Sequence, residues 1–319
     1  MKRIGILTSG GDSPGMNAAI RAVVRQGIYS GLEVWGIERG YEGLLNGELN
    51  LMDLHSVAGI IHRGGTILKT SRSEEFKTPE GQAKALANIR KFQLDGLVIV
   101  GGDGSLRGAQ VLSQKGIATI GLPGTIDNDI PCTDYTIGFD TALNTVLEAV
   151  SKIRDTAVSH ERIAIVEVMG RNSGYIALYA GLAGGAEVIL VPEQPMDMDA
   201  ICRRLLEKNQ RGKLYSIIMV AEGVANGFEI AEQVRTRTGF DPRVTILGYT
   251  QRGGSPSAFD TLLASRMGAK AVELLLEGET SKMVAIREGR IEGIEIEQIL
   301  SAKKELDWEL HQLAGILAT

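Results

Sequence analysis

The amino-acid sequence predicts an α/β protein with mostly parallel sheets and two domains. Short apolar segments that suit buried strands alternate with amphipathic segments that suit helices, and most of the strand segments end at a glycine. The alternation stops at one long amphipathic segment near the middle of the chain and then starts again. At 319 residues the chain also exceeds what one hydrophobic core usually serves. In such folds ligands bind at the carboxyl ends of the strands.

The first half of the chain contains four expected strands. They are Arg3 to Leu7, Leu32 to Ile37, Leu97 to Val100 and Ile117 to Ile120. Apolar residues at helical spacing from Ala18 to Ile28 predict a helix after the first strand. Another helix is expected to start near Ser105, and the glycine and proline after Ile120 are expected to end the fourth strand.

A long amphipathic helix is expected to begin at Phe139. Its apolar face is formed by Phe139, Ala142, Leu143, Val146, Leu147, Val150 and Ile153. Four further strands follow: Ile163 to Val168, Val188 to Val191, Ser216 to Ala221 and Val244 to Leu247. Because no Pro- or Ser-rich linker separates the halves, the start of this helix gives only an approximate domain boundary.

The composition is that of an ordinary globular protein, with 44% hydrophobic and 23% charged residues. A net charge of -5 argues against a dedicated nucleic-acid binder. Cys132 and Cys202 lack CxxC spacing, so neither a disulfide framework nor a zinc site is expected. The first apolar run is too short for a signal peptide and no run approaches a membrane span. We therefore expect a cytoplasmic protein without nucleic-acid or membrane partners.

Four glycine-bearing turns follow directly after expected strands. They are Ser9 to Gly15, Gly101 to Ser105, Gly121 to Thr125 and Gly170 to Gly174. Glycine lets backbone amides approach phosphate oxygens, and the start of a following helix favours an anion. None of the turns matches GxxxxGK[ST] or a full GxGxxG fingerprint with its acid, which disfavours P-loop kinases and nicotinamide dehydrogenases.

Carboxylates stand at two of these turns. Thr125, Asp127 and Asp129 supply a hydroxyl and two carboxylates within five residues, which suits a general base with a supporting carboxylate. Taken alone, this stretch is more often an acidic surface turn. Asp103 could hold magnesium that is shared with substrate phosphates, or it could cap the helix that follows. The local sequence does not decide between these roles.

Several arginines flank expected strand ends or glycine turns, where guanidinium groups match phosphate geometry. They are Arg72, Arg162, Arg171, Arg243 and Arg252. In contrast, Arg203, Arg204, Arg235 and Arg237 suit solvated helix faces. None of the four histidines stands at a glycine turn, so an aspartate base is favoured over a histidine base.

Five motifs together resemble the bacterial ATP-dependent 6-phosphofructokinase family. They are Thr8 to Asp12, Gly101 to Ser105, Pro123 to Asp129, Met169 to Arg171 and Gln251 to Gly254, in the order and at the spacing of the family. The resemblance implies two Rossmann-like three-layer domains in the phosphofructokinase fold. It places ATP on residues 1–138 plus 251–301, and fructose 6-phosphate on residues 139–250 plus 302–319.

The resemblance implies magnesium-dependent transfer of the ATP γ-phosphoryl group to O1 of fructose 6-phosphate, a step of glycolysis. Asp127 would take the proton, Thr125 and Arg171 would hold the phosphoryl group, and Asp103 would bind Mg²⁺, with Asp129 in support. The ATP positions implied are Gly11, Tyr41, Arg72, Ser73, Gly102, Asp103, Gly104 and Ser105, with Arg72 bridging the phosphates of both ligands. The sugar-phosphate positions are Thr125, Asp127, Arg162, Met169, Gly170, Arg171, Glu222, Arg243, Tyr249 and Arg252. In the family Arg162 and Arg243 reach the neighbouring subunit's site within a homotetramer.

Departures from the family concern the sugar phosphate and the regulation. Tyr249 stands where histidine is usual, and a tyrosine hydroxyl cannot become cationic. The effector site that binds ADP or phosphoenolpyruvate would comprise Arg21, Arg25, Arg154, Gly185, Glu187, Arg211 and Lys213. Gly59 replaces a common acid there, and Leu214 and Tyr215 replace common basic residues. Losing cations weakens an anion site, so we expect a weak or absent effector response.

Two alternatives to an ATP-dependent kinase remain: an enzyme with another phosphoryl donor and a protein without catalytic activity. Relatives that use pyrophosphate tend to carry Asp where this chain has Gly104 and Lys where it has Gly124, so both glycines favour ATP. A pyrophosphate-dependent phosphotransferase is the nearest alternative. A non-catalytic sensor of nucleotide or sugar phosphate would be expected to lose Asp127 or Arg171, and both are present.

Overall fold

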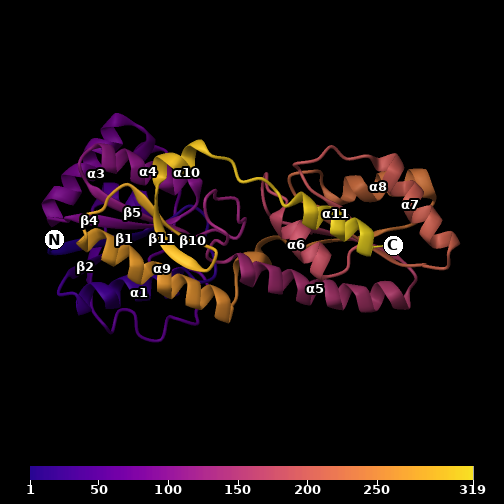
Figure 1. Ribbon diagram of the computed structural model, residues 1–319, viewed down its shortest axis with the longest axis horizontal. Coiled ribbons are helices and arrows are strands. Elements are labelled where there is room, and N and C mark those ends of the chain that lie inside the picture. The colour runs from indigo at the N-terminus through magenta and orange to yellow at the C-terminus, as the bar shows by residue number, and fades with distance from the viewer. Residues whose placement is uncertain (319) are drawn as a thin grey trace. The chain divides into compact units, whose positions relative to one another are not determined.

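The computed structural model describes residues 1–318 and divides them into two compact units (Figure 1). The first unit comprises residues 1–126, 130–141 and 252–304. The second comprises residues 127–129 and 142–251 and the described residues from 305 onward. The chain therefore passes from one unit to the other more than once, including within the stretch that contains Asp127.

The first unit is built on a seven-stranded sheet with the order β11-β10-β5-β4-β1-β2-β3. Its strands are β1 (Arg3–Ser9), β2 (Glu33–Ile37), β3 (Leu49–Met52), β4 (Gly96–Gly101), β5 (Ala118–Pro123), β10 (Lys282–Arg287) and β11 (Arg290–Glu295). Five of them pair in parallel, and only β3 and β11 pair antiparallel to their neighbours at the two sheet edges. The strands that carry the glycine turns are thus central.

Helices cover both faces of this sheet. One face packs under α1 (Met16–Tyr29) and α9 (Ala258–Leu276), which run side by side (Figure 1). The other face packs under α2 (Gly40–Asn46), α3 (Pro79–Phe92), α4 (Asp103–Gln114) and α10 (Ile296–Ser301). The side chains of β1 alternate between the two faces of the sheet: Ile4 and Ile6 pack in the core on the first face, and Leu7 packs in the core on the second. A strand that is buried on both faces must be apolar throughout.

The register aligns three of the glycine turns at one edge. Ser9 at the end of β1 pairs with Gly101 at the end of β4, and Gly101 pairs with Pro123 at the end of β5. Because all three strands run in parallel, the turns that follow them leave the sheet at the same carboxyl edge. This is the edge where the sequence predicts ligand binding.

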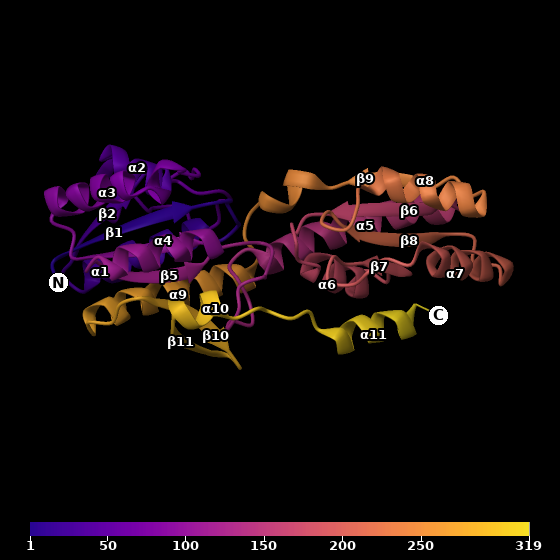
Figure 2. The ribbon, with the colours of Figure 1, turned by 90° about the horizontal axis from the view of Figure 1, so that it is seen from above.

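The second unit contains a fully parallel four-stranded sheet with the order β7-β8-β6-β9, which Figure 2 shows in reverse from top to bottom. Its strands are β6 (Ile163–Val168), β7 (Val188–Leu190), β8 (Ser216–Ala221) and β9 (Arg243–Ile246). One face packs under α7 (Met198–Gln210) and α8 (Gly227–Thr238). On the other, Gly181 of α6 (Tyr175–Ala183) lies against Ile189 and Met219. Two more helices complete the unit: α5 (Phe139–Ser159), which starts in the first unit, and α11 (Trp308–Leu317).

The structure confirms the α/β class and the mostly parallel sheets, and it corrects several element bounds. β5 runs on through Gly121 and Leu122 to Pro123 instead of ending at Ile120, because Gly101 pairs with Pro123. Helix α4 begins at Asp103, two residues before the expected start. The strands β3, β10 and β11 were not predicted. β3 and β11 are half-exposed edge strands, which carry a weaker apolar signal than central ones, whereas β10 lies inside the sheet and is mostly buried.

None of the helices within residues 1–318 combines the length and apolar character that crossing a bilayer requires. Both cysteines are free, Cys202 in the core and Cys132 only partly buried.

Candidate active site

Arg252 and Gly11 meet at the first turn of the first unit. The Arg252 guanidinium donates from Nη1 to the carbonyl of Asp12 over 3.2 Å. A Cβ atom at Gly11 would lie 2.0 Å from that nitrogen, so only glycine leaves room for the guanidinium. The structure therefore places Arg252, which was expected to bind the sugar phosphate, in contact with Gly11, which was expected to bind ATP.

The second turn is packed against the first. The Ser105 hydroxyl donates to the Ser9 carbonyl over 3.1 Å, and a Cβ atom at Gly101 would lie 2.3 Å from the Ser105 oxygen. Gly101 is thus required because two turns approach closely. Gly104, in contrast, is exposed and faces open space. The amides at the start of α4 are available there to an anionic ligand.

Arg72 and Ser73 belong to a segment that is tied to the same turns. The Thr70 hydroxyl donates to the Gly10 carbonyl over 2.8 Å, and the Thr8 hydroxyl donates to the Lys69 carbonyl over 2.7 Å. Arg72 is exposed, and the Ser73 hydroxyl accepts a hydrogen bond from the amide of Phe76. The first unit therefore gathers the expected ATP residues, from four chain segments, at one edge of its sheet.

Tyr41 is buried beneath the start of α4, next to this edge of the sheet. Its ring is 5% exposed and stacks on Phe76 with a centroid separation of 4.1 Å. Its hydroxyl donates to the Ser105 carbonyl over 2.6 Å, and burial raises its pKa well above the ordinary value. Tyr41 thus holds the start of α4 in place, while its expected contact with adenine stays a prediction.

Asp127 is a buried carboxylate of the second unit. It is 5% exposed, whereas Asp129 is exposed. Asn128 between them has a left-handed backbone with φ 50° and is itself buried. This turn lets one carboxylate face inward and the other face solvent, so the two aspartates do not share one environment.

The loop after β6 carries Met169, Gly170 and Arg171. Gly170 has φ 138°, and a Cβ atom there would lie 2.3 Å from the Ser173 carbonyl oxygen. The Arg171 amide donates to Glu222 Oε1 over 2.8 Å. Because Val168 pairs with Ala221, the loops after β6 and β8 leave the same edge of the sheet. Four of the expected sugar-phosphate residues are therefore neighbours: Met169, Gly170, Arg171 and Glu222.

Arg162 and Arg243 are not brought to this edge. Arg162 immediately precedes β6, and Arg243 is the first residue of β9, in register with Ala164. Both therefore lie at the amino edge of the sheet, which corrects our expectation that they flank the ligand-binding strand ends. Arg243 pairs with Asp241 at 3.1 Å. Tyr249 follows β9 at the carboxyl edge and is 82% exposed.

Similarity to known proteins agrees with this geometry. A family model described as Phosphofructokinase matches residues 3–275. The chain belongs to the phosphofructokinase family. An ATP-dependent 6-phosphofructokinase from Halalkalibacterium halodurans is 58% identical over 318 residues, which cover 100% of each chain.

Solved phosphofructokinase structures share the fold. The chain superposes on phosphofructokinase from Saccharomyces cerevisiae with a TM-score of 0.88 at 37% identity, covering 99% of this chain and 47% of the yeast chain. It therefore spans about half the length of the yeast chain. A pyrophosphate-dependent phosphofructokinase from Marinobacter aquaeolei gives a TM-score of 0.84 at 25% identity, covering 97% and 86% of the two chains. A phosphofructokinase named as pyrophosphate-dependent thus shares this fold, and the fold alone does not decide the donor.

The donor set of the first unit fits magnesium. Asp103 lies in the first turn of α4, and Gly102 occupies the cap position, so Asp103 is not the helix cap considered from the sequence. Its carboxylate is 53% exposed and accepts hydrogen bonds from Arg107 at 3.0 and 3.2 Å. Within residues 1–318 no three His, Cys, Asp or Glu side chains gather into a metal cluster. A lone exposed carboxylate beside a phosphate-binding turn is how Mg²⁺ is held when substrate phosphates supply the other ligands.

The expected effector residues are partly engaged with the protein itself. Arg154 donates to the carbonyls of Gly184 and Gly185, and Glu187 is 4% exposed, paired with Lys213 and with the amide of Ile217. Lys213 also lies over the Tyr215 ring at 5.4 Å. Arg21 and Arg25 lie on α1, where burial and the charge of Arg25 lower the pKa of Arg21. Arg211 is exposed, and Gly59 has a left-handed backbone with φ 67°.

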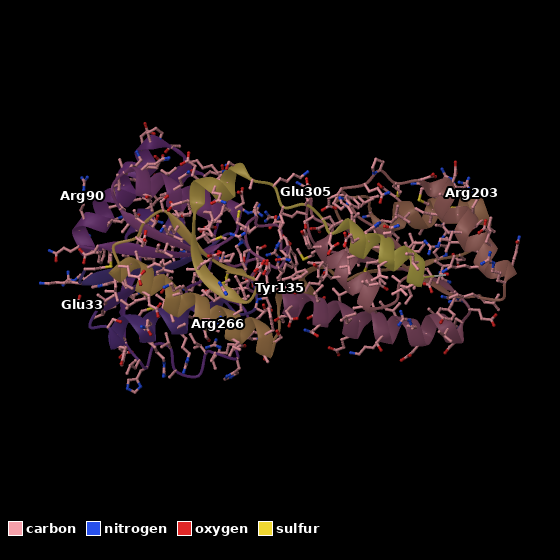
Figure 3. All side chains as sticks on the ribbon, in the orientation of Figure 1. Glu33, Arg90, Tyr135, Arg203, Arg266 and Glu305 are labelled. Atoms are coloured by element: carbon pink, nitrogen blue, oxygen red, sulfur yellow. The ribbon has the colours of Figure 1, made fainter. Side chains whose placement is uncertain are left out.

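The remaining arginines differ from one another. Arg203 is exposed on α7 as expected (Figure 3). Arg204, on the same helix, donates to the Gly315 carbonyl over 2.9 Å, so it helps to hold α11 and is not simply solvated. Arg235 and Arg237 form ion pairs with Asp241 and Asp199.

Three supporting residues escaped the sequence analysis. Ser173 donates to the Asp127 carbonyl, Glu193 accepts from the Gly174 amide at 2.9 Å, and Gln251 accepts from the Met169 amide at 3.2 Å. Ser173 lies within a marked glycine turn, and Gln251 begins one of the five motifs that resemble the family; these positions were their only signals, and neither pointed to the contact that each makes. Glu193 acts from another loop, so nothing local reveals it.

Proposed function

We propose that this protein is an ATP-dependent 6-phosphofructokinase, which transfers the γ-phosphoryl group of ATP to O1 of fructose 6-phosphate. The observation that carries the proposal is the 58% identity, over the full length of both chains, with a relative of that name. The products are fructose 1,6-bisphosphate and ADP, as in glycolysis, and we place the reaction in the cytoplasm. Fructose 6-phosphate and ATP are its proposed small-molecule partners.

Asp127 is the proposed general base. Its carboxylate accepts the proton of the sugar 1-hydroxyl while the O1–P bond forms and the bond from the γ-phosphorus to the bridging oxygen of ADP breaks. A well-placed base contributes about 10²–10⁴-fold to the rate. Asp129 lies two residues after Asp127 and is exposed, and it is proposed to be a supporting carboxylate near the base.

The phosphoryl group is proposed to be held by Thr125, Arg171 and Arg72. Phosphoryl transfer depends mainly on positioning and on stabilising the charge of the transferring group, which suits a hydroxyl and two guanidinium groups. Arg171 lies on a loop that the Glu222 carboxylate fixes through the Arg171 amide, which limits the positions its side chain can reach. Mg²⁺, when bound, neutralises the charge of the ATP phosphates, and Asp103 is the residue that would hold it.

The two units are proposed to divide the substrates. The first, with its aligned turns at Ser9, Gly101 and Pro123, would bind ATP. The second, with Met169, Arg171 and Glu222 as neighbours, would bind fructose 6-phosphate. Arg162 and Arg243, at the amino edge of that sheet, are proposed to serve the neighbouring subunit of a homotetramer.

ATP is the proposed donor, and pyrophosphate is the alternative. Gly104 carries no side chain, and a Cβ atom added there would meet no atom within 4 Å, so this position at the start of α4 leaves space beside the turn for a nucleotide phosphate. Position 124 is also a glycine in this chain, whereas pyrophosphate-dependent relatives tend to carry a lysine there. For the effector site we propose a weak response to ADP and phosphoenolpyruvate, since Leu214 and Tyr215 supply no charge.

The test compares donors and removes the base. Fructose 6-phosphate and Mg²⁺ are incubated with ATP or with pyrophosphate, using wild type, Asp127→Ser and the control Asp155→Ser, which changes an exposed aspartate of α5. We expect fructose 1,6-bisphosphate only with ATP, a loss of kcat of about 10²–10⁴-fold in Asp127→Ser and no loss in the control. Turnover with pyrophosphate would show that the donor assignment is wrong. Binding without turnover would instead favour a sensor.

A further inference from the structure

The side chain of Ser173 connects the proposed base to the loop of Arg171. Its hydroxyl donates to the main-chain carbonyl of Asp127 with an Oγ–O distance of 3.1 Å. Ser173 is 6% exposed, so this hydrogen bond is shielded from water. The same hydroxyl oxygen accepts a longer hydrogen bond, 3.4 Å, from the amide of Tyr175 at the start of α6. Both ends of the connection lie within the second unit.

Backbone contacts hold Ser173 firmly. Its own amide donates to the Gly170 carbonyl over 2.8 Å and closes a tight turn. On one side of Ser173 the amide of Arg171 donates to Glu222, and on the other the amide of Gly174 donates to Glu193. Carboxylates from two other loops thus fix the backbone on both sides of Ser173, and Ser173 is a rigid point from which to hold Asp127.

The bond reaches the main chain of Asp127 and not its carboxylate. A carboxylate is separated from its main chain by only two rotatable bonds, so the direction of the Cα–Cβ bond largely decides where its oxygens lie. Asn128, the next residue, has a left-handed backbone with φ 50°, a conformation that asparagine adopts more readily than most residues and that surrounding contacts further stabilise. A hydrogen bond to the carbonyl of Asp127, directly before Asn128, provides such a contact.

We propose that Ser173 is a positioning residue for Asp127, which sets the direction of the base relative to the loop that carries Arg171. This inference rests on the proposed function, because it assigns Ser173 a part in proton removal. Ser173 touches neither substrate in this role; it acts through the main chain of Asp127. A small displacement of a catalytic group lowers the rate without a matching loss of binding.

The test separates positioning from stability. Ser173→Ala removes the hydroxyl, Ser173→Cys keeps the shape with a weak donor, and Ser173→Thr restores a hydroxyl. Ser265→Ala is the matched control: it removes a hydroxyl that donates to the Thr261 carbonyl over 2.8 Å within α9. For each variant kcat, the KM of ATP and of fructose 6-phosphate, and Tm are measured. Ser173→Ala is also combined with Asp127→Ser.

We expect kcat to fall about 10- to 100-fold in Ser173→Ala, with both KM values within about 3-fold of wild type. The kcat of Ser173→Cys should lie between those of wild type and Ser173→Ala. The kcat of Ser173→Thr should be close to that of wild type, and the kcat of Ser265→Ala should equal it. In the Asp127→Ser background, Ser173→Ala should lower the residual kcat by less than about 2-fold, because the group that it positions is already gone.

Three outcomes would overturn the proposal. If Ser173→Ala and Ser173→Cys keep wild-type kcat, Ser173 positions nothing, although the proposed function stands. If the loss in Ser173→Ala persists undiminished beside Asp127→Ser, the hydroxyl acts on something other than the base. If wild type does not phosphorylate fructose 6-phosphate with ATP, the proposed function fails first and this role fails with it. Should Ser173→Ala not fold, Ser173→Cys decides by the same comparisons.

Discussion

The guanidinium of Arg252 fills the space that any side chain at Gly11 would need. A Cβ atom at Gly11 would lie 2.0 Å from Arg252 Nη1, and that nitrogen donates to the carbonyl of the adjacent Asp12. The residues are far apart in sequence and both belong to the first unit. A change at the proposed ATP turn must therefore move an arginine that the family resemblance places on the sugar phosphate.

We predict that Gly11→Ala raises the KM for fructose 6-phosphate as well as that for ATP. The atoms in the way are the far end of a flexible side chain, so the protein should fold while Arg252 leaves its position. A hydrogen bond to a charged group is worth about 1.5–3 kcal/mol, which corresponds to a rise in KM of roughly 10- to 100-fold. Steady-state kinetics in both substrates measure the effect.

Gly104→Ala is the control for this prediction. Position 104 faces open space, so alanine there should leave the KM for fructose 6-phosphate unchanged. A rise confined to the KM for ATP in Gly11→Ala would show that Arg252 does not bind the sugar phosphate from this position.

The two glycines that favour ATP should respond differently to the residues of pyrophosphate-dependent relatives. Gly104→Asp should fold with an unchanged or slightly higher Tm, because an acidic residue in the first turn of α4 suits the helix dipole. Gly124→Lys should lower Tm, because its Cβ would lie 2.8 Å from the Val100 Cγ1 atom of a central strand and 3.1 Å from Met16.

Thermal unfolding and donor assays distinguish the two variants. We expect Gly104→Asp to lower kcat/KM for ATP by about 10-fold or more while its fold is intact, since a carboxylate repels nucleotide phosphates. If Gly124→Lys has a wild-type Tm, the packing argument is wrong. If Gly104→Asp uses ATP as well as wild type does, Gly104 does not select the donor.

Asp260 should make the stability depend on pH. It lies within the first turn of α9 and is fully buried, and it accepts hydrogen bonds from the amides of Gly138 and Thr141 and from the Thr141 hydroxyl at 2.6–2.9 Å. It thereby caps the start of α5 from a distant segment. Desolvation raises its pKa to about 6, despite these hydrogen bonds, which lower it.

The direction of the pH effect on stability follows from which state, folded or unfolded, binds the proton of Asp260 more tightly. Below the ordinary pKa of 3.8 the carboxyl is protonated in both states, and its stabilising contribution is complete. As the pH rises towards 6 the unfolded chain releases the proton first, so the folded state loses stability relative to it, by about 3 kcal/mol in all. Urea unfolding of wild type and Asp260→Asn between pH 4 and pH 7 should show the advantage of wild type shrinking by most of that amount. A difference that is independent of pH would contradict the assignment.

Effectors should change the kinetics little. With fructose 6-phosphate varied near neutral pH, phosphoenolpyruvate and ADP should shift half-saturation by less than about 2-fold, because Leu214 and Tyr215 supply no cations and Glu187 is already paired with Lys213. The variant Leu214→Arg with Tyr215→Lys should strengthen the phosphoenolpyruvate response. A strong response of wild type to either molecule would refute the prediction.

Much of the fold could be predicted because the central strands carry unambiguous signals. β1, β4, β6 and β8 are buried on both faces, so their apolar runs stand out, and each ends at or near a glycine turn. The edge strands β3 and β11, the strand β10 and the helices α2, α3, α9, α10 and α11 were missed, and the two edge strands are half-exposed, which gives a mixed pattern. Motif order likewise indicated Asp127, Arg171 and the glycine turns, since these residues are local in sequence.

By itself the sequence determined the α/β class, the residue types at the strand ends and the resemblance to a kinase family. Only the tertiary structure decided which of those residues are neighbours. It joined Arg252 to Gly11, Ser173 to Asp127 and Asp260 to the start of α5, and it left Arg162 and Arg243 at the opposite edge of their sheet from Arg171. The physical reason is that sequence patterns report local geometry and burial, whereas hydrogen bonds between distant segments depend on sheet order and register.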